Sequence, residues 1–402
     1  MKQLFIFLAI GLFCSAFGAE PAAVPSASAE KSAAIADASY SAPARASIAK
    51  AAAYLAKHQK PKGNFSNPRF PGLSGLALWA LIGSNDKQYD PVIEKGIDYL
   101  LSTVQKDGGI YCPVPGREGG GLSTYNTAVC LTALSFVKGR DLTRVILDAR
   151  TFLADSQLSG EDSFSGGFGY DKSSPNRYAD LMNAHFVMEA MRRTEKYEDK
   201  RPAGEKKADL DWDAALAFAE RLQNDADAGD SAGGFSYSPA DAKAGTETVQ
   251  SKDDGQQAED GVSLEKGKEK IIMRSYGSIT YAGLLALVYC KLDRTDSRVR
   301  SALDWASKHW TLEENPGVGD QGLYFFYDVI GRSLSVSGID FIERPEHASA
   351  VDWRSELVNK LISLQRENGS YQNSNSRFWE NDPILSTAYS AIALEFAIRQ
   401  LQ

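Results

Sequence analysis

The sequence predicts an all-α protein, an (α/α)6 barrel in which six helix-pair repeats close into a ring around a central cavity. Three observations predict this fold class. A short motif of glutamine, glycine and an aromatic residue recurs along the chain, an amphipathic helix precedes each copy, and a mostly apolar helix follows it. A helix that is apolar on every side is buried on every side, so the alternation indicates an inner ring of helices inside an outer one.

The first 18 residues are typical of an export signal. An apolar run from Leu4 to Phe13 follows a short basic start and precedes Ala16-Phe17-Gly18, where small residues suit a signal peptidase. The run is shorter than the roughly 20 residues that span a bilayer. We therefore expect a signal peptide at residues 1–18 and a periplasmic or extracellular protein. A lipoprotein signal ending at Cys14 is the alternative, which the bulky neighbouring Phe13 disfavours.

Composition narrows the possible partners. The chain carries a net charge of −8 and has no cluster of lysine and arginine, which argues against nucleic acid and against an anionic membrane surface. Residues 19–46, rich in Ala, Ser and Pro, are expected to form a linker. Beyond the signal, Cys112, Cys130 and Cys290 make an odd number of cysteines, which predicts no disulfide framework, although one bridge could form.

The recurring motif divides residues 47–402 into six repeats, which begin near residues 48, 93, 146, 212, 299 and 353. The clearest copies are Gln105–Tyr111 and Gln365–Tyr371. In the fifth copy Trp310 replaces the glutamine. The remaining copies start at Gln59, Gln157 and Gln223.

The helix after each motif is expected to belong to the inner ring, because its residues are apolar on nearly every side. An open solenoid, the alternative to a closed ring, would leave one surface of this layer wet. Two insertions, 194–210 and 239–270, are expected on the surface, the second disordered and able to act as a lid. The expected inner helices are Leu73–Ile82, Thr124–Val137, Ala179–Met191, Ser278–Cys290, Leu323–Leu334 and Ile384–Ile398.

These repeats resemble those of the squalene cyclase and protein prenyltransferase superfamily. Glutamine and glycine turns between helix pairs carry the resemblance over about residues 48–398, most clearly at Gln105–Tyr111, Gln365–Tyr371 and Ser275–Leu284. The family's motif usually ends in tryptophan, whereas Phe or Tyr stands there in this chain. The resemblance implies an α/α toroid whose cavity takes a small-molecule or lipid-like ligand, and it does not carry over a particular activity.

The signatures of the two best-known activities of that superfamily do not occur in this sequence. Hopene-type cyclases protonate an alkene with a D-x-D-D cluster. The nearest string, Asp209–Asp213, has different spacing and starts an outer helix, where acids act as caps. Prenyltransferases hold zinc through a D-x-C pair and a distant histidine. No D-x-C occurs in the chain, and its 4 histidines have no paired spacing, so we expect no metal and no cofactor.

The loops that enter the inner helices should surround one mouth of the cavity, and the candidate site residues lie there. Asp328 stands inside an aromatic segment, and a buried carboxylate must be either paired or functional. His185 lies near carboxylates and could act as an acid or base. The predicted catalytic residues are Asp180, His185, Asp328 and Glu380, and the predicted ligand-binding residues are Asn126, Asn183, Tyr281, Tyr324, Tyr327 and Trp379.

Three functions remain open at this point. An exported protein that binds or processes an isoprenoid-like ligand by a non-standard route should have a mostly apolar cavity with one carboxylate at its end. A carbohydrate-active lyase or hydrolase should have an open polar groove with two facing carboxylates. A non-catalytic binding or scaffold protein is the third, and a pure scaffold would have a filled ring. Aromatic side chains suit either ligand, since ring faces stabilise cations and stack on sugars.

Overall fold

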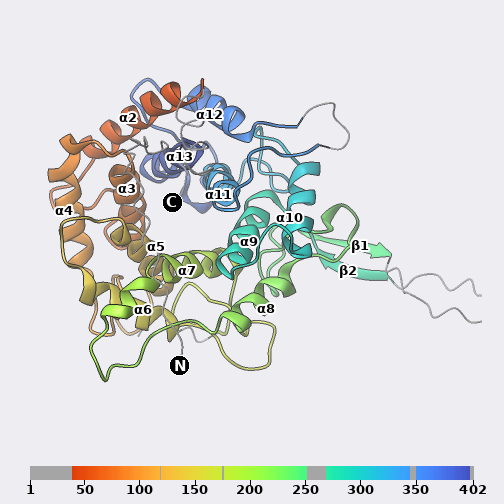
Figure 1. The fold of residues 1–402 in the computed structure, drawn as a ribbon, viewed down its shortest axis with the longest axis horizontal. Coiled ribbons are helices and arrows are strands. Elements are labelled where there is room, and N and C mark those ends of the chain that lie inside the picture. The colour runs from red at the N-terminus through yellow and green to blue at the C-terminus, as the bar shows by residue number, and fades with distance from the viewer. Residues whose placement is uncertain (1–38, 118, 174–175, 251–268, 345–349, 399–402) are drawn as a thin grey trace, which may run out of the picture.

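The computed structural model describes residues 39–117, 119–173, 176–250, 269–344 and 350–398. Its helices form two concentric rings, so the predicted all-α (α/α)6 barrel is confirmed (Figure 1). The inner helices are α3 (Pro71–Gly83), α5 (Ser123–Ser135), α7 (Leu181–Arg193), α9 (Gly277–Tyr289), α11 (Leu323–Val336) and α13 (Pro383–Ile398). The outer helices are α2 (Ser41–Lys57), α4 (Asp90–Leu101), α6 (Thr143–Ala154), α8 (Trp212–Leu222), α10 (Ser297–Lys308) and α12 (Trp353–Leu364).

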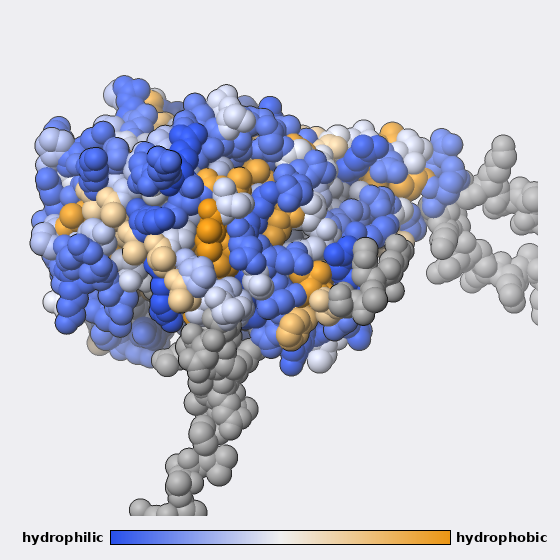
Figure 2. All heavy atoms as spheres, turned by 90° about the horizontal axis from the view of Figure 1, so that it is seen from above, coloured by the Kyte–Doolittle hydropathy of each residue, from blue (hydrophilic) through white to orange (hydrophobic). Residues whose placement is uncertain are grey.

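The inner ring is closed. Each inner helix packs against the next, and α13 packs against α3 as well as against α11. The side chains explain the two layers: α9 is buried from Gly277 to Leu287, whereas α10 buries Val299, Ala302, Trp305 and Ala306 on one face only. Figure 2 shows one face of the molecule, on which hydrophilic side chains predominate around smaller hydrophobic patches.

In four repeats the glutamine of the motif joins the repeat to the next one. Gln59 donates its side-chain amide to Gly63 of its own turn and to Val92 in α4. Gln365 makes the same pair of bonds to Gly369 and to Ser47 in α2, which ties the sixth repeat to the first. Gln157 and Gln223 repeat the pattern. The glutamine is therefore a clamp between neighbouring outer helices.

Two repeats depart from this clamp. Gln105 bonds only to backbone oxygens beside its own turn, those of Thr103 and Tyr111. In the fifth repeat the indole of Trp310 donates to Glu356 in α12 at 2.8 Å. The tryptophan thus reaches the same neighbouring helix as a glutamine would, with a different donor.

A hydroxyl in the first turn of several inner helices holds the glycine turn of the same repeat. The Thr387 hydroxyl accepts a hydrogen bond from the backbone N–H of Tyr371 at 3.0 Å. Packing is close here, since a Cβ on Gly369 (φ 87°) would lie 2.3 Å from the Lys50 carbonyl oxygen. Ser74, Thr127 and Thr280 occupy the equivalent position and accept from Phe65, Ile110 and Phe235.

Two boundaries expected from the sequence need correction. Helix α2 begins at Ser41, inside the expected linker 19–46, because Ser41 and Ala44 are buried against the ring. The segment 239–270, expected to be disordered, contains strand β1 (Thr246–Gln250) and the start of β2 (Glu269–Met273), which pair antiparallel and project from the ring beside α10 (Figure 1). Residues 251–268, like the expected signal peptide 1–18, lie outside the described residues.

Short 3₁₀ turns complete the described structure, at Lys87–Tyr89, Glu195–Lys200, Gly229–Ser231 and Arg377–Trp379. The three cysteines Cys112, Cys130 and Cys290 are free. Across the described ranges, every helix is too short or too polar to cross a membrane.

Candidate functional site

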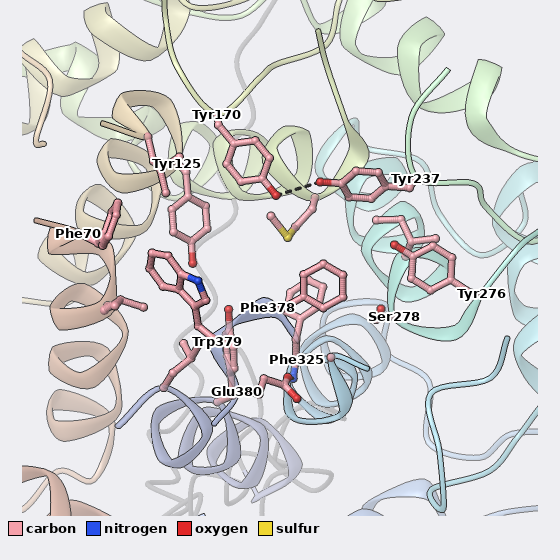
Figure 3. Close-up of a pocket in the computed structure, with 17 residues that line it drawn as sticks. Phe70, Tyr125, Tyr170, Tyr237, Tyr276, Ser278, Phe325, Phe378, Trp379 and Glu380 are labelled. Carbon is pink, nitrogen blue, oxygen red and sulfur yellow. Dashed lines mark hydrogen bonds between the residues drawn. The ribbon is translucent and has the colours of Figure 1, made fainter. Parts of the chain in front are cut away.

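A pocket of about 300 Å³ opens at the mouth of the ring where the inner helices begin (Figure 3). Aromatic side chains make up most of its wall, and Glu380 is its one charged residue among those the structure describes. The aromatic lining comes from Phe70, Tyr125, Tyr170, Tyr237, Tyr276, Phe325, Phe378, Trp379 and Tyr389. The other lining residues are Leu73, Leu122, Met182, Ser278, Ile279, Gly322 and Leu385.

Two neighbouring aromatic residues form an exposed rim on this pocket. Phe378 and Trp379 are each 44% exposed, and their backbones adopt left-handed conformations with φ of 58° and 65°. Bulky residues rarely occupy that region, and such strain is typical of functional positions. The Trp379 ring lies 4.6 Å from that of Phe70, which faces it across one side of the pocket (Figure 3). The rim therefore offers aromatic surface to a ligand.

Two of the tyrosine hydroxyls of the pocket are paired with each other. Tyr170 and Tyr237 share a hydrogen bond of 2.9 Å, drawn in Figure 3. Burial raises the pKa of the Tyr125 hydroxyl to about 12. These phenols are consequently neutral, and part of their hydrogen-bonding capacity is already used.

Each inner helix begins against a side-chain oxygen that accepts from one of its first backbone N–H groups. Those N–H groups have no partner within the helix, and a carboxylate there also offsets the positive end of the helix dipole. Four of the six acceptors belong to carboxylates. In helix order from α3 to α13 the acceptors are Asn126, Asp171, Asp180, Asn315, Glu380 and Asp382.

Glu380 combines this capping role with a place in the pocket. One carboxylate oxygen accepts from the Phe325 backbone N–H in α11, and the other accepts from the Asn373 side-chain amide, both at 2.8 Å. The residue is fully buried, and that burial raises its pKa to about 6 against the lowering effect of its hydrogen bonds. Both donors are uncharged amides, so hydrogen bonds and no ion pair among the described residues stabilise the charge of this carboxylate.

Asp180 lies behind the pocket wall rather than on it. Its two oxygens accept from the backbone and side-chain nitrogens of Asn183, at 2.8 and 2.7 Å. Burial raises the pKa of Asp180 to about 7, and hydrogen bonds from Asn183 and from the Tyr237 hydroxyl oppose that rise. Asp180 is thus not among the residues that line the pocket.

A buried group of charges occupies the later turns of the same helices. Arg332 in α11 pairs with Glu189 at 3.1 Å and with Asp328 at 3.2 Å, and all three side chains are fully buried. Arg193 adds a second pair to Glu189 at 2.8 Å. Burial, and secondarily Glu189, raise the pKa of Asp328 to about 7 against the opposing charge of Arg332. Asp328 is therefore paired, the first of the two alternatives that the sequence leaves open.

His185 lies in the same buried region. Burial and the charge of Arg332 lower its pKa to about 3, so the imidazole is neutral at ordinary pH. Neither ring nitrogen has a hydrogen-bond partner among the described residues.

Of the ten residues predicted for the site, the structure places Glu380 and Trp379 in the pocket wall. Asn126 and Asn183 are buried, and their amides hold a neighbouring helix end and Asp180. Tyr281, Tyr324 and Tyr327 are also buried, among aromatic neighbours in the ring.

Sequence reasoning missed all five tyrosines that line the described pocket. Tyr170 and Tyr237 are the last residues of the glycine turns Gly166–Tyr170 and Gly233–Tyr237. Their place at the end of a glycine turn is a signal that could have identified them.

No protein-family model matches the chain, and no curated protein matches its sequence. Solved structures do resemble it. The GH76A α-1,6-mannanase from Salegentibacter sp. HEL1_6 covers 88% of this chain with 98% of its own, at 11% identity and a TM-score of 0.51. An inactive variant of that mannanase, with two aspartates changed to asparagine and α-1,6-mannotriose bound, matches at 12% identity with the same coverage and a TM-score of 0.51. At this identity the likeness shows a shared toroid fold.

Proposed function

We propose that the protein binds a carbohydrate at the aromatic pocket, with a sugar ring stacked on the exposed rim. The observation that carries this proposal is the pair Phe378 and Trp379, two half-exposed aromatic residues held in left-handed backbone at the pocket edge. Soluble proteins rarely leave such rings exposed together and strained unless a ligand uses them.

The chemistry of the pocket suits such a ligand. A sugar ring has C–H groups on its faces and hydroxyls at its edge, so it needs flat apolar surface together with a few polar groups. Trp379 and Phe70 supply the surface, and Ser278 and the phenols supply polar atoms. The fold likeness to the mannanase, which is an enzyme that acts on a carbohydrate, supports the same ligand class.

The proposal is limited to binding. Glycoside hydrolysis generally uses two carboxyl groups on either side of the bond that breaks. Glu380 is the one carboxyl group in the described pocket wall, and both of its oxygens already accept hydrogen bonds. The chain's only two consecutive aspartates, Asp253 and Asp254, lie outside the described residues.

An isoprenoid-like ligand is the second candidate, favoured by the aliphatic part of the wall. Leu73, Ile279 and Leu385 line the pocket, and the paired phenols leave few free donors for the many hydroxyls of a sugar. Polar groups that enter such a pocket without partners lose binding energy.

Titration calorimetry with a panel of oligosaccharides, α-1,6-mannotriose among them, and with a short isoprenoid alcohol would test both candidates. We expect saturable binding of at least one saccharide, weakened about tenfold or more by Trp379→Ala through loss of stacking. Phe341→Ala is the matched control, because Phe341 is 58% exposed and does not line the pocket. If only the isoprenoid binds, and Trp379→Ala weakens it, the carbohydrate proposal is replaced by the second candidate.

A further inference from the structure

We propose that the pocket selects ligands that carry a positive charge, such as an organic ammonium group. Applied to the proposed function, on which this part rests, the carbohydrate would be one with free amino groups. The inference comes from the distribution of charge around the pocket, which the stacking argument does not use.

The wall itself is the first line of evidence. Its aromatic faces carry the negative side of the ring quadrupole, and a cation within about 6 Å of such faces is attracted to them. Among the described residues that line the pocket there is no lysine, arginine or histidine. A neutral ligand would gain only from contact with the apolar surface of this wall, whereas a cation would also be attracted by the negative faces of its aromatic rings.

The carboxylate of Glu380 is the second line of evidence. It is fully buried at the pocket, and the groups that donate to it are the uncharged amides of Phe325 and Asn373. Among the described residues, no basic side chain forms an ion pair with it. A buried carboxylate without a counter-charge is costly, and an ammonium group bound in the pocket would supply one.

Positive ends of helices point to the same mouth and would oppose a cation, since each carries roughly half a charge. Side-chain oxygens already occupy those ends. Asp180, Glu380 and Asp382 cap three of the helices and form no ion pair with a described basic residue. Asp171, the fourth carboxylate cap, pairs with Arg117 at 2.7 Å. The carboxylate caps therefore offset the positive helix ends at the mouth.

One basic group near the pocket, Lys243, is engaged outside it, and a second, the Arg377 guanidinium, lies 5.4 Å from the centroid of the Phe378 ring at the rim. The Lys243 ammonium lies over the Tyr237 ring at 5.0 Å from its centroid and also pairs with Asp241. Lys243 is not part of the wall, so it occupies Tyr237 from outside the pocket. The contact shows that this ring already attracts an ammonium group, as the proposal requires of the wall.

Choline and its neutral isostere dimethylbutanol separate charge from shape, and glucosamine oligomers with free or acetylated amines do the same for a sugar. We expect choline to bind about tenfold or more tightly than dimethylbutanol, and free-amine oligomers to bind more tightly than acetylated ones, by calorimetry. Glu380→Gln should reduce both preferences, because it removes the negative charge that distinguishes the two members of each pair.

Glu380 also caps α11, so the variant's thermal unfolding would be compared with that of the native protein. If Glu380→Gln does not fold, Trp379→Leu tests the proposal instead, because loss of that ring should weaken choline more than dimethylbutanol. This inference would be overturned if neutral sugars bind as tightly as amino sugars and choline binds no more tightly than dimethylbutanol. The proposed function would then still stand. Preference for choline with no binding of any sugar would support charge selection and overturn the carbohydrate proposal. Binding of neither cation nor sugar would overturn both.

Discussion

The two ends of the inner helix ring are built from the same helices but differ in how their charges are satisfied. At the end where the helices begin, carboxylates such as Glu380 and Asp180 accept hydrogen bonds from amide N–H groups near an aromatic pocket. Toward the end where the helices finish, Glu189 and Asp328 are paired with arginines inside packed protein. The first end has a pocket for a ligand, whereas the acids farther along the helices are satisfied by the protein's own ion pairs.

The direction of the helices explains this difference. All inner helices start at the mouth, so their positive ends attract acceptors there, while Arg192 and Arg193 lie in the last turn of α7, where the negative end favours cations. An acid at the mouth can be held by backbone amides alone. Farther along the helices the backbone amides are used within the helix, so an acid needs a cation. Four predictions test this contrast.

Replacing Arg332 with leucine should have the largest effect. Asp328 loses its one ion-pair partner among the described residues, and Glu189 loses one of two. Breaking a buried pair in this way typically costs about 3–5 kcal/mol, which urea unfolding would measure as a lower free energy of unfolding. Adding Asp328→Asn to the variant should recover part of the loss. A single variant as stable as the native protein would contradict the contrast.

The ring that separates the two ends depends on its glycine turns. Gly369→Ala should cost about 3 kcal/mol, because the new Cβ meets the Lys50 carbonyl oxygen and the positive φ is strained. Gly319→Ala is the matched control, since Gly319 has a φ of 65° and nothing within 4 Å of a new Cβ. We expect the control to cost about 1 kcal/mol in thermal or urea unfolding. Equal losses at the two positions would show that the close approach does not matter.

A smaller effect concerns pH and the mouth acid Asp180. Its folded pKa of about 7 lies above the ordinary 3.8, so the folded state binds more protons than the unfolded state between those values. Its contribution therefore lowers the free energy of unfolding as pH rises through that window. Asp180→Asn keeps a capping oxygen and should flatten this part of the stability profile. A profile of unchanged slope would show that Asp180 ionises in the folded protein as easily as in the unfolded one.

Trp379→Leu should have the smallest effect on stability. The residue is 44% exposed at the rim, and substitutions at such positions usually change the free energy of unfolding by less than about 0.5 kcal/mol. Ligand binding should nevertheless weaken, as proposed above. A large loss of stability would assign the rim to the fold rather than to a ligand.

The fold could be predicted from the sequence because the features that produce it recur in repeat after repeat. Five of the six repeats carry a glutamine turn, and inner helices such as α9 are apolar all round. Neither signal depends on distant contacts. The exact placement of side chains around the ring does depend on them. Phe325 lines the pocket while its neighbours Tyr324 and Tyr327 turn toward other parts of the ring, a difference that the sequence does not reveal.

Two site predictions had simpler explanations within reach of the sequence. Asp328 and Arg332 are four residues apart on one helix, a spacing that permits an ion pair. Asn126 and Asn183 stand at the first turn of inner helices, where amide side chains serve helix ends. The pocket tyrosines were missed because they come from turns and helices far apart in the sequence, and only the closed ring brings these segments to one mouth.

The bond from Gln365 to Ser47 has a consequence for how the molecule assembles. It joins residues 318 positions apart, so it can form only when the chain has bent through a full circle. Bonds of the same kind within the chain, such as Gln59 to Val92, span 33 positions. Bonds between neighbouring repeats can thus form locally and arrange the repeats in an arc. The last bond closes the loop of nearly the whole chain, so its formation carries the largest cost in chain entropy. Once that clamp forms, no repeat is first or last, and each has a neighbour on both sides.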